Sequence, residues 1–579
     1  MEQQTTSIYS TSQKLPLSTN QIAWAGTIAL VTIHLFFLLW ASPIYRNSDD
    51  SIYSRYAHQI AEGTYEYNHN SNQSFQHRYG VTVPTALGYK LFGVNRYSLV
   101  LWAWICSILT LTLLFNFALR RYGPAAAFIA GLIFATNTKQ ISTALMLSVD
   151  VIVSLFMFLA AIILYEARQS NAKEMETFFS VSFVTTLILA TLSKLVVITI
   201  FPAITILLLI DLKNRRNIAL WLKIISYGLL FGALYLTWMH FYTGNFMSRF
   251  SGTIDVVQSL GSMNITVFKD MMDNLPARLT YKPALMILSI PGVLIPLLLA
   301  LSLTNIFTEQ KLKLFTETSH WWLFILSITL FIWVVPTSFS PFIPLLLVPR
   351  YFLPLIPFFS LIAGVALAST FNKSLSYVVT KQFFWWLCFI YLLIYPLLNT
   401  LGFFKLGVLI VTVPVLFALF WDKATFLSSS FGALRTPILS LLYLLVFSML
   451  PSHFILNNII GEKPWQTAER EIVQRYFLDD KESKVVYTNK RGIIAINFLI
   501  GYENFNNLEL VNWDRVTTKK IAAEVKHYIY INKHVIKGLQ ATYSRTPPPF
   551  VNSPPPDWEL VEESKGIAIY TTQNTPNFN

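Results

Sequence analysis

Long apolar stretches constrain this chain more than any other feature of its sequence. A helix needs about 20 apolar residues to cross the hydrocarbon core of a bilayer, and about thirteen stretches of that kind occur here. They lie near residues 22–42, 98–119, 124–138, 146–165, 178–193, 195–211, 220–242, 283–303, 320–336, 350–370, 383–400, 403–421 and 435–451. The sequence therefore predicts an all-α polytopic membrane domain of about 12 or 13 transmembrane helices. The lower number applies if one long tilted helix runs through Ser193-Lys194.

Composition supports this prediction and excludes several classes of protein. Hydrophobic residues make up 54% of the chain and charged residues only 13%, whereas soluble domains carry about 25% charged residues. A soluble enzyme or a nucleic-acid binder is therefore excluded for the chain as a whole. The formal net charge of +13 instead indicates basic cytoplasmic loops and contacts with anionic lipid. The two cysteines lie inside apolar runs and predict neither a disulfide framework nor a metal site.

The distribution of basic residues predicts the orientation in the membrane. With residues 1–21 as a cytoplasmic tail, the paired basic residues fall in cytoplasmic loops, as the positive-inside rule requires. These pairs are Arg120-Arg121, Arg168 with Lys173, Lys213 with Arg215-Arg216, Lys311 with Lys313, Lys373 with Lys381, and Lys423 with Arg435. The transmembrane domain then spans residues 22–451. The loops 43–97 and 243–282 and everything after about residue 452 are expected on the extracytoplasmic side.

Residues 452–579 have the composition of a soluble domain. A helix is predicted from Pro464, strands at 484–488, 508–513 and 528–532, and helices near 491–501, 515–525 and 533–541. A terminal hairpin is predicted at 558–561 and 567–571. This alternation indicates a small extracytoplasmic α/β domain with a mainly parallel sheet. No glycine-rich phosphate loop occurs in it, so we expect it to cover the site and select acceptors rather than to carry out chemistry.

Two adjacent carboxylates, Asp49 and Asp50, follow the first apolar stretch. They are also typical of the first turn of a helix, which here runs to Glu62 and ends at Gly63. The two interpretations are compatible, because an interfacial helix would hold the carboxylates at the membrane surface. Carboxylates close to lipid have altered proton affinities, which suits a general base.

The same loop contains basic residues beside the carboxylates. Arg55, Arg78 and Lys90 suit a ligand with an anionic head and an apolar tail, although snorkelling at the membrane interface also explains such residues. The histidines His58, His69 and His77 are irregularly spaced and are only a weak indication of a metal site.

Several motifs, taken in their order along the chain, resemble a known family. These are Asp49-Asp50 with the helix after it, the string His77-Arg78-Tyr79-Gly80, the stretch Tyr89–Gly93 before the second span, and Arg350-Tyr351-Phe352-Leu353-Pro354. Together they resemble the membrane glycosyltransferases of the GT-C fold, specifically the protein O-mannosyltransferase and lipid A aminoarabinose transferase group. The resemblance in sequence motifs covers residues 20–370. The remainder of the chain resembles the family in its architecture alone.

This resemblance implies a set of catalytic carboxylates. Asp49 would be the catalytic base and Asp50 its supporting neighbour. Asp150 falls where the family has another acidic residue, although a first-turn acid at a helix N-terminus is also an ordinary structural feature.

The resemblance also implies how the carrier phosphate is bound. The break at Ser193-Lys194 resembles a family position where a lysine meets this phosphate. Arg350, a cation at the start of a span, is expected to be a second contact, and Arg78 supplies a further cation. His77 stands where the aminoarabinose transferases have an acidic residue, so it is the one candidate ligand for a divalent metal. The resemblance leaves such a metal open and implies no other cofactor.

The sequence and the resemblance together predict an integral-membrane glycosyltransferase of the cell membrane. It would transfer a hexosyl or pentosyl group from a polyprenyl-phosphate carrier to a protein, lipid or glycan acceptor on the extracytoplasmic face, by inverting displacement. The alternatives are a transporter or flippase of lipid-linked sugars and an inactive relative that acts as a scaffold. Transporters tend to have internal repeats and broken midplane helices. No such repeat is visible here.

Overall fold

A computed structural model describes most of the chain outside its terminal tail and two long central segments. The residues that it describes are 19–43, 45, 49–67, 73–170, 172, 174–249, 309–334, 336–339, 342–344, 349–370, 464–479, 482–502, 507–515, 525–537, 548–572 and 576. The predicted spans 283–303, 383–400, 403–421 and 435–451 lie outside these residues, as does most of the predicted helix 515–525.

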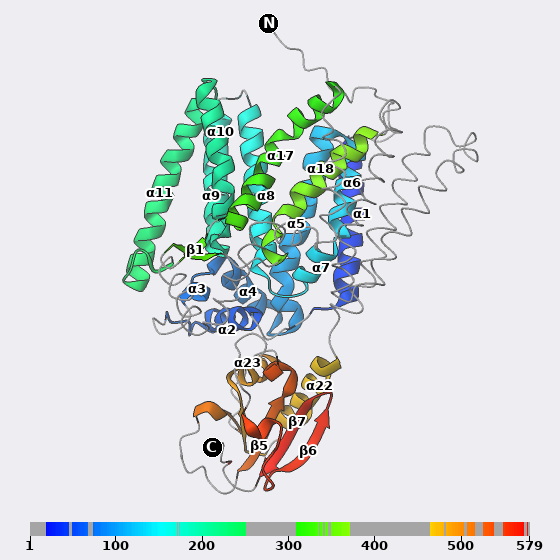
Figure 1. Ribbon diagram of the computed structural model, residues 1–579, viewed down its shortest axis with the longest axis vertical. Coiled ribbons are helices and arrows are strands. Elements are labelled where there is room, and N and C mark those ends of the chain that lie inside the picture. The colour runs from blue at the N-terminus through cyan, green and yellow to red at the C-terminus, as the bar shows by residue number, and fades with distance from the viewer. Residues whose placement is uncertain are drawn as a thin grey trace, which may run out of the picture.

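The membrane domain is a bundle of apolar helices (Figure 1). Six of the described helical segments are long and apolar enough to cross a bilayer, which makes this a multi-pass membrane protein. They are α1 (Thr19–Ala41), α5 (Arg96–Tyr122), α8 (Val149–Gln169), α9 (Met175–Ser193), the joined pair η1 (Leu195–Ile200) and α10 (Phe201–Lys213), and α11 (Ile218–Thr243). The remaining helices of the bundle are α6 (Pro124–Ala135), α7 (Thr138–Ala144), α17 (Glu309–Val334) and α18 (Leu355–Thr370).

The predicted spans in the described part of the chain coincide with these helices. At the one uncertain position, α9 ends at Ser193 and a new helical segment begins at Leu195. Lys194 between them has an extended backbone, with φ −158° and ψ 140°. Two helices are therefore present where the sequence alone also permitted one.

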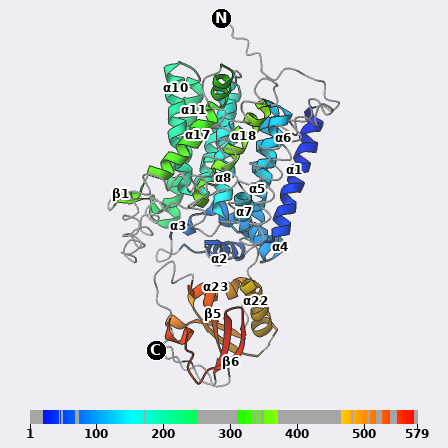
Figure 2. The ribbon, with the colours of Figure 1, turned by 45° about the vertical axis from the view of Figure 1, so that its right-hand side comes forward.

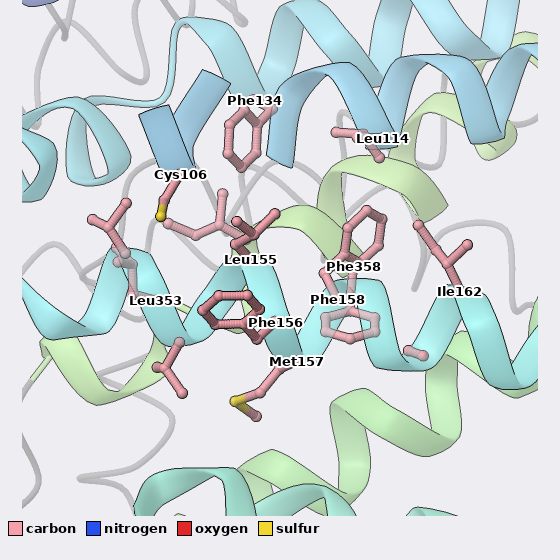
Figure 3. Close-up of a cluster of buried hydrophobic side chains, with 14 of the residues drawn as sticks. Cys106, Leu114, Phe134, Leu155, Phe156, Met157, Phe158, Ile162, Leu353 and Phe358 are labelled. Carbon is pink, nitrogen blue, oxygen red and sulfur yellow. The ribbon is translucent and has the colours of Figure 1, made fainter. Parts of the chain in front are cut away.

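Helix α8 lies at the centre of the bundle, and its side chains form much of the core (Figure 3). Phe158 packs edge-on against Phe358 of α18, with ring centroids 5.2 Å apart. Helix α18 also approaches α6 closely, because a Cβ built on Gly364 would lie only 2.5 Å from the carbonyl oxygen of Ala126. Small residues at such contacts are how membrane helices obtain close van der Waals packing.

Three short helices cover one end of the bundle. They are α2 (Asp49–Glu62), α3 (Gln73–Gln76) and α4 (Tyr79–Phe92), and α2 lies across the bundle between it and the C-terminal domain (Figures 1 and 2). Helix α2 matches the predicted helix, and it ends before Gly63, whose φ of 71° favours glycine. A short antiparallel pair, β1 (Pro336–Phe339) and β2 (Phe342–Pro344), follows α17.

The C-terminal domain is a five-stranded sheet with helices beside it. Its elements are α22 (Pro464–Val473), η6 (Gln474–Leu478), β3 (Lys484–Thr488), α23 (Lys490–Leu499), β4 (Leu508–Asn512), η7 (Trp513–Arg515), β5 (Lys526–Asn532), η8 (Pro549–Val551), β6 (Glu559–Ser564) and β7 (Ile567–Thr572). The strand order is β4-β3-β5-β7-β6.

This sheet corrects one prediction, because it is mixed rather than mainly parallel. Strand β3 pairs in parallel with β4 and β5, whereas β7 pairs antiparallel with both β5 and β6. The cause is the terminal hairpin, which adds its second strand to the edge of β5. A hairpin connects antiparallel strands through a tight turn, whereas a parallel pair needs a crossover.

Aromatic contacts attach this domain to the membrane domain. Tyr45 stacks on Phe498 of α23 with ring centroids 4.1 Å apart, and His58 of α2 stacks on Tyr502 at 4.7 Å. The Tyr502 hydroxyl also donates a hydrogen bond of 3.0 Å to the Ser54 hydroxyl oxygen. One face of α2 is thus held by the C-terminal domain.

Candidate functional site

Asp49 is the first residue of α2, where a carboxylate interacts favourably with the helix dipole. Its Oδ2 accepts a hydrogen bond of 3.1 Å from Nη1 of Arg350. Arg350 lies in the short helix η2 (Pro349–Phe352), immediately before α18. Both side chains remain partly exposed, so a ligand can reach this ion pair.

Asp150 makes a second ion pair. It lies in the first turn of α8, after the capping residue Ser148. Its Oδ1 accepts a hydrogen bond of 2.5 Å from Nζ of Lys194, and both side chains are largely buried. Lys194 reaches Asp150 because it occupies the extended break between α9 and η1. The extended backbone at this break thus brings Lys194 to Asp150, and its contact with a carrier phosphate stays a prediction.

Tyr351 links the two ion pairs. Nζ of Lys194 lies 4.2 Å from the centre of the Tyr351 ring, and the guanidinium carbon of Arg350 lies 5.7 Å from it. A cation over an aromatic face is attracted by the ring quadrupole. Tyr351 lies within the Arg350–Pro354 motif, but no pattern in the sequence assigns it a role.

Arg78 brings a third cation to this group from the start of α4. Its Nη1 donates to the hydroxyl oxygen of Tyr53, which lies one turn after Asp49 on α2, and its guanidinium carbon lies 4.6 Å from the centre of the Phe75 ring. Burial lowers the pKa of Arg78, although the carboxylates of Asp49 and Asp150 act in the opposite direction.

Arg249 is a fourth cation, which sequence reasoning missed. It is buried, and Nη2 donates a hydrogen bond of 3.1 Å to the carbonyl oxygen of Thr191. Burial and the charge of Arg78 lower the pKa of Arg249 to about 10. It therefore stays protonated at neutral pH. The only sequence signal is an arginine at the start of the loop 243–282.

We refer to Asp49, Arg78, Asp150, Lys194, Arg249, Arg350 and Tyr351 as the site cluster. In this group of described residues, four cations face two carboxylates. The cluster therefore carries two excess positive charges, which suits a dianionic group such as a phosphate.

Asp50 does not belong to the site cluster, although it is adjacent to Asp49 in the sequence. It is buried, and its charge contributes to raising the pKa values of Tyr45 and Tyr502, after the larger effect of burial. Tyr502 belongs to the C-terminal domain. Tyr45 belongs to the membrane domain, so Asp50 lies near the contact between the two domains, whereas Asp49 pairs with Arg350.

His77 lies apart from these carboxylates. Its Nε2 is 2.8 Å from the hydroxyl oxygen of Ser248, and its ring stacks on Tyr67. Burial, followed by the charge of Arg249, lowers its pKa to about 4. The described residues include no group of three or more His, Cys, Asp or Glu side chains that could hold a metal ion. The role of His77 as a metal ligand thus remains a prediction with no second ligand from these residues.

Comparisons with known proteins support the fold. The model of the family described as Dolichyl-phosphate-mannose-protein mannosyltransferase matches residues 82–241, a segment that includes Asp150 and Lys194. A search of curated proteins finds no match.

Two similar solved structures are those of ArnT from Cupriavidus metallidurans, one bound to undecaprenyl phosphate and one in the apo state. The first is 15% identical in sequence, covers 96% of this chain and 99% of that chain, and has a TM-score of 0.57. The second is 15% identical, covers 96% of this chain and 100% of that chain, and has a TM-score of 0.56. The predicted GT-C fold is confirmed.

Proposed function

We propose that this protein is a membrane glycosyltransferase that takes a sugar from a polyprenyl-phosphate carrier and transfers it to an acceptor hydroxyl. The observation that carries this proposal is the excess of positive charge around one partly exposed carboxylate, Asp49. The likeness to ArnT, solved with undecaprenyl phosphate, supports a carrier of this class.

The reaction requires few groups, because a sugar linked to a phosphate is already activated for transfer. Asp49 takes the proton of the acceptor hydroxyl as the oxygen attacks the anomeric carbon. The bond between that carbon and the phosphate oxygen breaks, and its electron pair leaves with the phosphate. Arg78, Lys194 and Arg350 stabilise the departing charge. A single displacement of this kind inverts the anomeric centre.

The ion pair of Asp49 and Arg350 implies that the carrier binds before Asp49 accepts a proton. A phosphate that enters the cluster competes with Asp49 for the Arg350 guanidinium, because both are anionic acceptors. Binding of the carrier would therefore release Asp49 from its partner and leave it free to accept a proton. Asp150 stays with Lys194 and positions that ammonium group.

The organisation of the chain follows from this assignment. We assign residues 1–21 to the cytoplasm, 22–451 to the transferase domain and 452–579 to an extracytoplasmic domain that covers the site and selects acceptors. The acceptor is a protein, a lipid or a glycan, and the sugar a hexosyl or pentosyl group. The turn between α10 and α11, which carries Lys213, Arg215 and Arg216, lies at the end of the bundle opposite α2 (Figure 1). The positive-inside rule then puts α2 and the site outside.

The decisive experiment separates chemistry from binding. The substitution Asp49→Asn should lower sugar transfer by about 10²–10⁴-fold, the usual effect of losing a general base. It should not weaken carrier binding, because the phosphate competes with Asp49 for the Arg350 guanidinium. Arg350→Gln and Lys194→Gln should weaken carrier binding by about 10- to 100-fold as well, because each removes a charge-assisted hydrogen bond. Transfer is measured by mass spectrometry with a panel of polyprenyl-phosphate sugars, and carrier affinity is measured on the same samples in nanodiscs.

The control for this experiment is Asp50→Asn, which removes the adjacent carboxylate, about 100° around α2 from Asp49. Transfer at the wild-type rate by both aspartate variants would exclude Asp49 as the base and leave Asp150 as the next candidate. Tight carrier binding without transfer from any donor in the panel would favour a transporter or flippase.

A further inference from the structure

A cavity of about 250 Å³ lies where α2 meets the C-terminal domain. Its polar lining consists of Arg55 from α2, Lys490 and Asn497 from α23, Tyr502, and Asn512 from β4, and two isoleucines of α23 complete it. No carboxylate lines this cavity among the described residues. The role proposed for Asp49 makes no use of it.

This cavity lies on the other side of α2 from the site cluster. Arg55 follows Asp49 by six residues, which places it about 9 Å further along the helix and about 120° around it. Tyr53 on the Asp49 side contacts Arg78, whereas Ser54 and His58 contact Tyr502 of the C-terminal domain. The cavity is thus a separate feature of the interface between the two domains.

The cations of this cavity have no acidic partner in the described part of the chain. Nε of Arg55 is buried and forms no hydrogen bond there. Lys490 is the first residue of α23, where a positive charge opposes the helix dipole, and Arg491 follows it. Two like charges therefore face each other across the interface, which disfavours contact between the domains unless an anion lies between them.

We propose that this cavity binds a phosphate group. The guanidinium of Arg55 and the ammonium of Lys490 supply charge, and the side chains of Asn497 and Asn512 supply further polar contacts from two elements. These side chains offer more hydrogen-bond donors than the two oxygens of one carboxylate can accept. The larger number of oxygens on a phosphate suits them better. The phosphate belongs either to a soluble molecule or to a lipid headgroup. Its binding neutralises the repulsion and holds the C-terminal domain against α2, a role that goes beyond glycosyl transfer.

The test uses the full-length protein in nanodiscs of phosphatidylcholine. Saturating polyprenyl monophosphate first occupies the site cluster, and inorganic phosphate is then titrated by calorimetry. We expect saturable binding that Lys490→Gln weakens about 10-fold, the effect of one charge-assisted contact. Arg55→Gln should have a similar effect, and the double variant should show no binding. Because Lys490 is exposed, its substitution leaves the fold intact.

Matched controls are Lys537→Gln, at an exposed lysine of the same domain outside the cavity, and Arg120→Gln, at an exposed arginine at the far end of α5. Both should bind phosphate as the wild type does. A second arm replaces inorganic phosphate with phosphatidic acid in the nanodisc. Competition between the two identifies a lipid headgroup as a ligand, and binding of inorganic phosphate alone identifies a soluble one.

Absence of phosphate binding in both arms, or equal binding by the double variant, would overturn the proposal. Its outcome is independent of the proposed function, which depends on carrier binding and transfer. If polyprenyl monophosphate fails to bind, the same titration is made with the variant Lys194→Gln/Arg350→Gln, which removes two cations of the site cluster. Arg55→Gln and Lys490→Gln are then added to this variant. If these two further substitutions abolish the binding of inorganic phosphate, the cavity is still supported as the phosphate site.

Discussion

Tyr351 lies between two cations that belong to different helices. Lys194 stands in the break between α9 and η1, and Arg350 stands before α18, yet both lie over the same ring. Each cation also pairs with a carboxylate, Asp150 for Lys194 and Asp49 for Arg350. The aromatic ring holds the two positive charges in place without neutralising them. Individual side chains therefore decide how strongly this site attracts an anion.

Replacing Tyr351 tests this role. Tyr351→Leu should weaken carrier binding by about 2- to 30-fold, the range expected for loss of a cation–π contact. Tyr351→Phe keeps the ring and should bind nearly as well as the wild type. The measurement is the affinity for polyprenyl monophosphate in nanodiscs. Equal affinities for the leucine and phenylalanine variants would show that the ring has no such role.

The buried His77 predicts how stability depends on pH. Its pKa is about 4 in the folded protein, compared with 6.5 for an unperturbed histidine side chain in water. Between these values the unfolded chain binds a proton that the folded protein does not, so stability falls as the pH falls from about 6.5 to about 4. The expected loss is on the order of 3 kcal/mol, and it is absent above pH 6.5.

The measurement is the free energy of unfolding in mixed micelles across this pH range, for the wild type and for His77→Gln. Glutamine can still bond to Ser248 but does not titrate. The difference between the two curves isolates His77 from the other histidines. Parallel curves would contradict this prediction.

At the scale of elements, the site depends on where helices begin and end. Asp49, Asp150 and Arg78 all lie at helix starts, and Lys194 lies in a helix break. Side chains from these helix ends meet there, as the ion pair between Asp150 and Lys194 shows. The position of Arg350 in turn depends on α18, which packs against α6 through Gly364.

Gly364→Ala tests how strictly the position of α18 is determined. The added Cβ would lie 2.5 Å from the carbonyl oxygen of Ala126, so the helices must separate. We expect a loss of about 1–3 kcal/mol of stability, as for other overpacked cores, together with weaker carrier binding because Arg350 moves. Gly232→Ala in α11 is the matched control, because nothing lies within 4 Å of a Cβ there. Equal stability of the two variants would refute the close contact.

At the scale of the whole molecule, α2 lies between the membrane domain and the C-terminal domain. One side of this helix carries Asp49 towards the site cluster, and the other carries Ser54 and His58 towards Tyr502. Any change in how the C-terminal domain docks would therefore move the helix that holds the proposed base. The domain and the site share one element rather than a flexible connection.

The predicted orientation is tested by labelling single cysteines in a variant that lacks Cys106 and Cys388. An impermeant reagent should label Ser564→Cys in intact cells, because the C-terminal domain is expected outside. Arg216→Cys, in the exposed turn between α10 and α11, should be labelled only after lysis. The reverse pattern would invert the topology and place the site in the cytoplasm.

Local patterns in the sequence were sufficient for much of this architecture. Apolar length predicted the described membrane helices, because a lipid environment requires continuous helical hydrogen bonding. Alternation and turn residues predicted the strands of the C-terminal domain, and a first-turn acid pair followed by Gly63 predicted α2. Family resemblance, rather than spacing, pointed to Asp150, Lys194 and Arg350 as site residues.

The sequence by itself determined which described segments are long and apolar enough to cross the membrane and which residue types were available for chemistry, because these depend on local composition. Only the tertiary structure decided that Asp49 pairs with Arg350, that Arg249 lies near Arg78, and that the sheet is mixed. These features depend on contacts between segments up to several hundred residues apart. Such contacts are set by packing and by the pairing of charges at the ends of elements, and no single stretch of sequence encodes them.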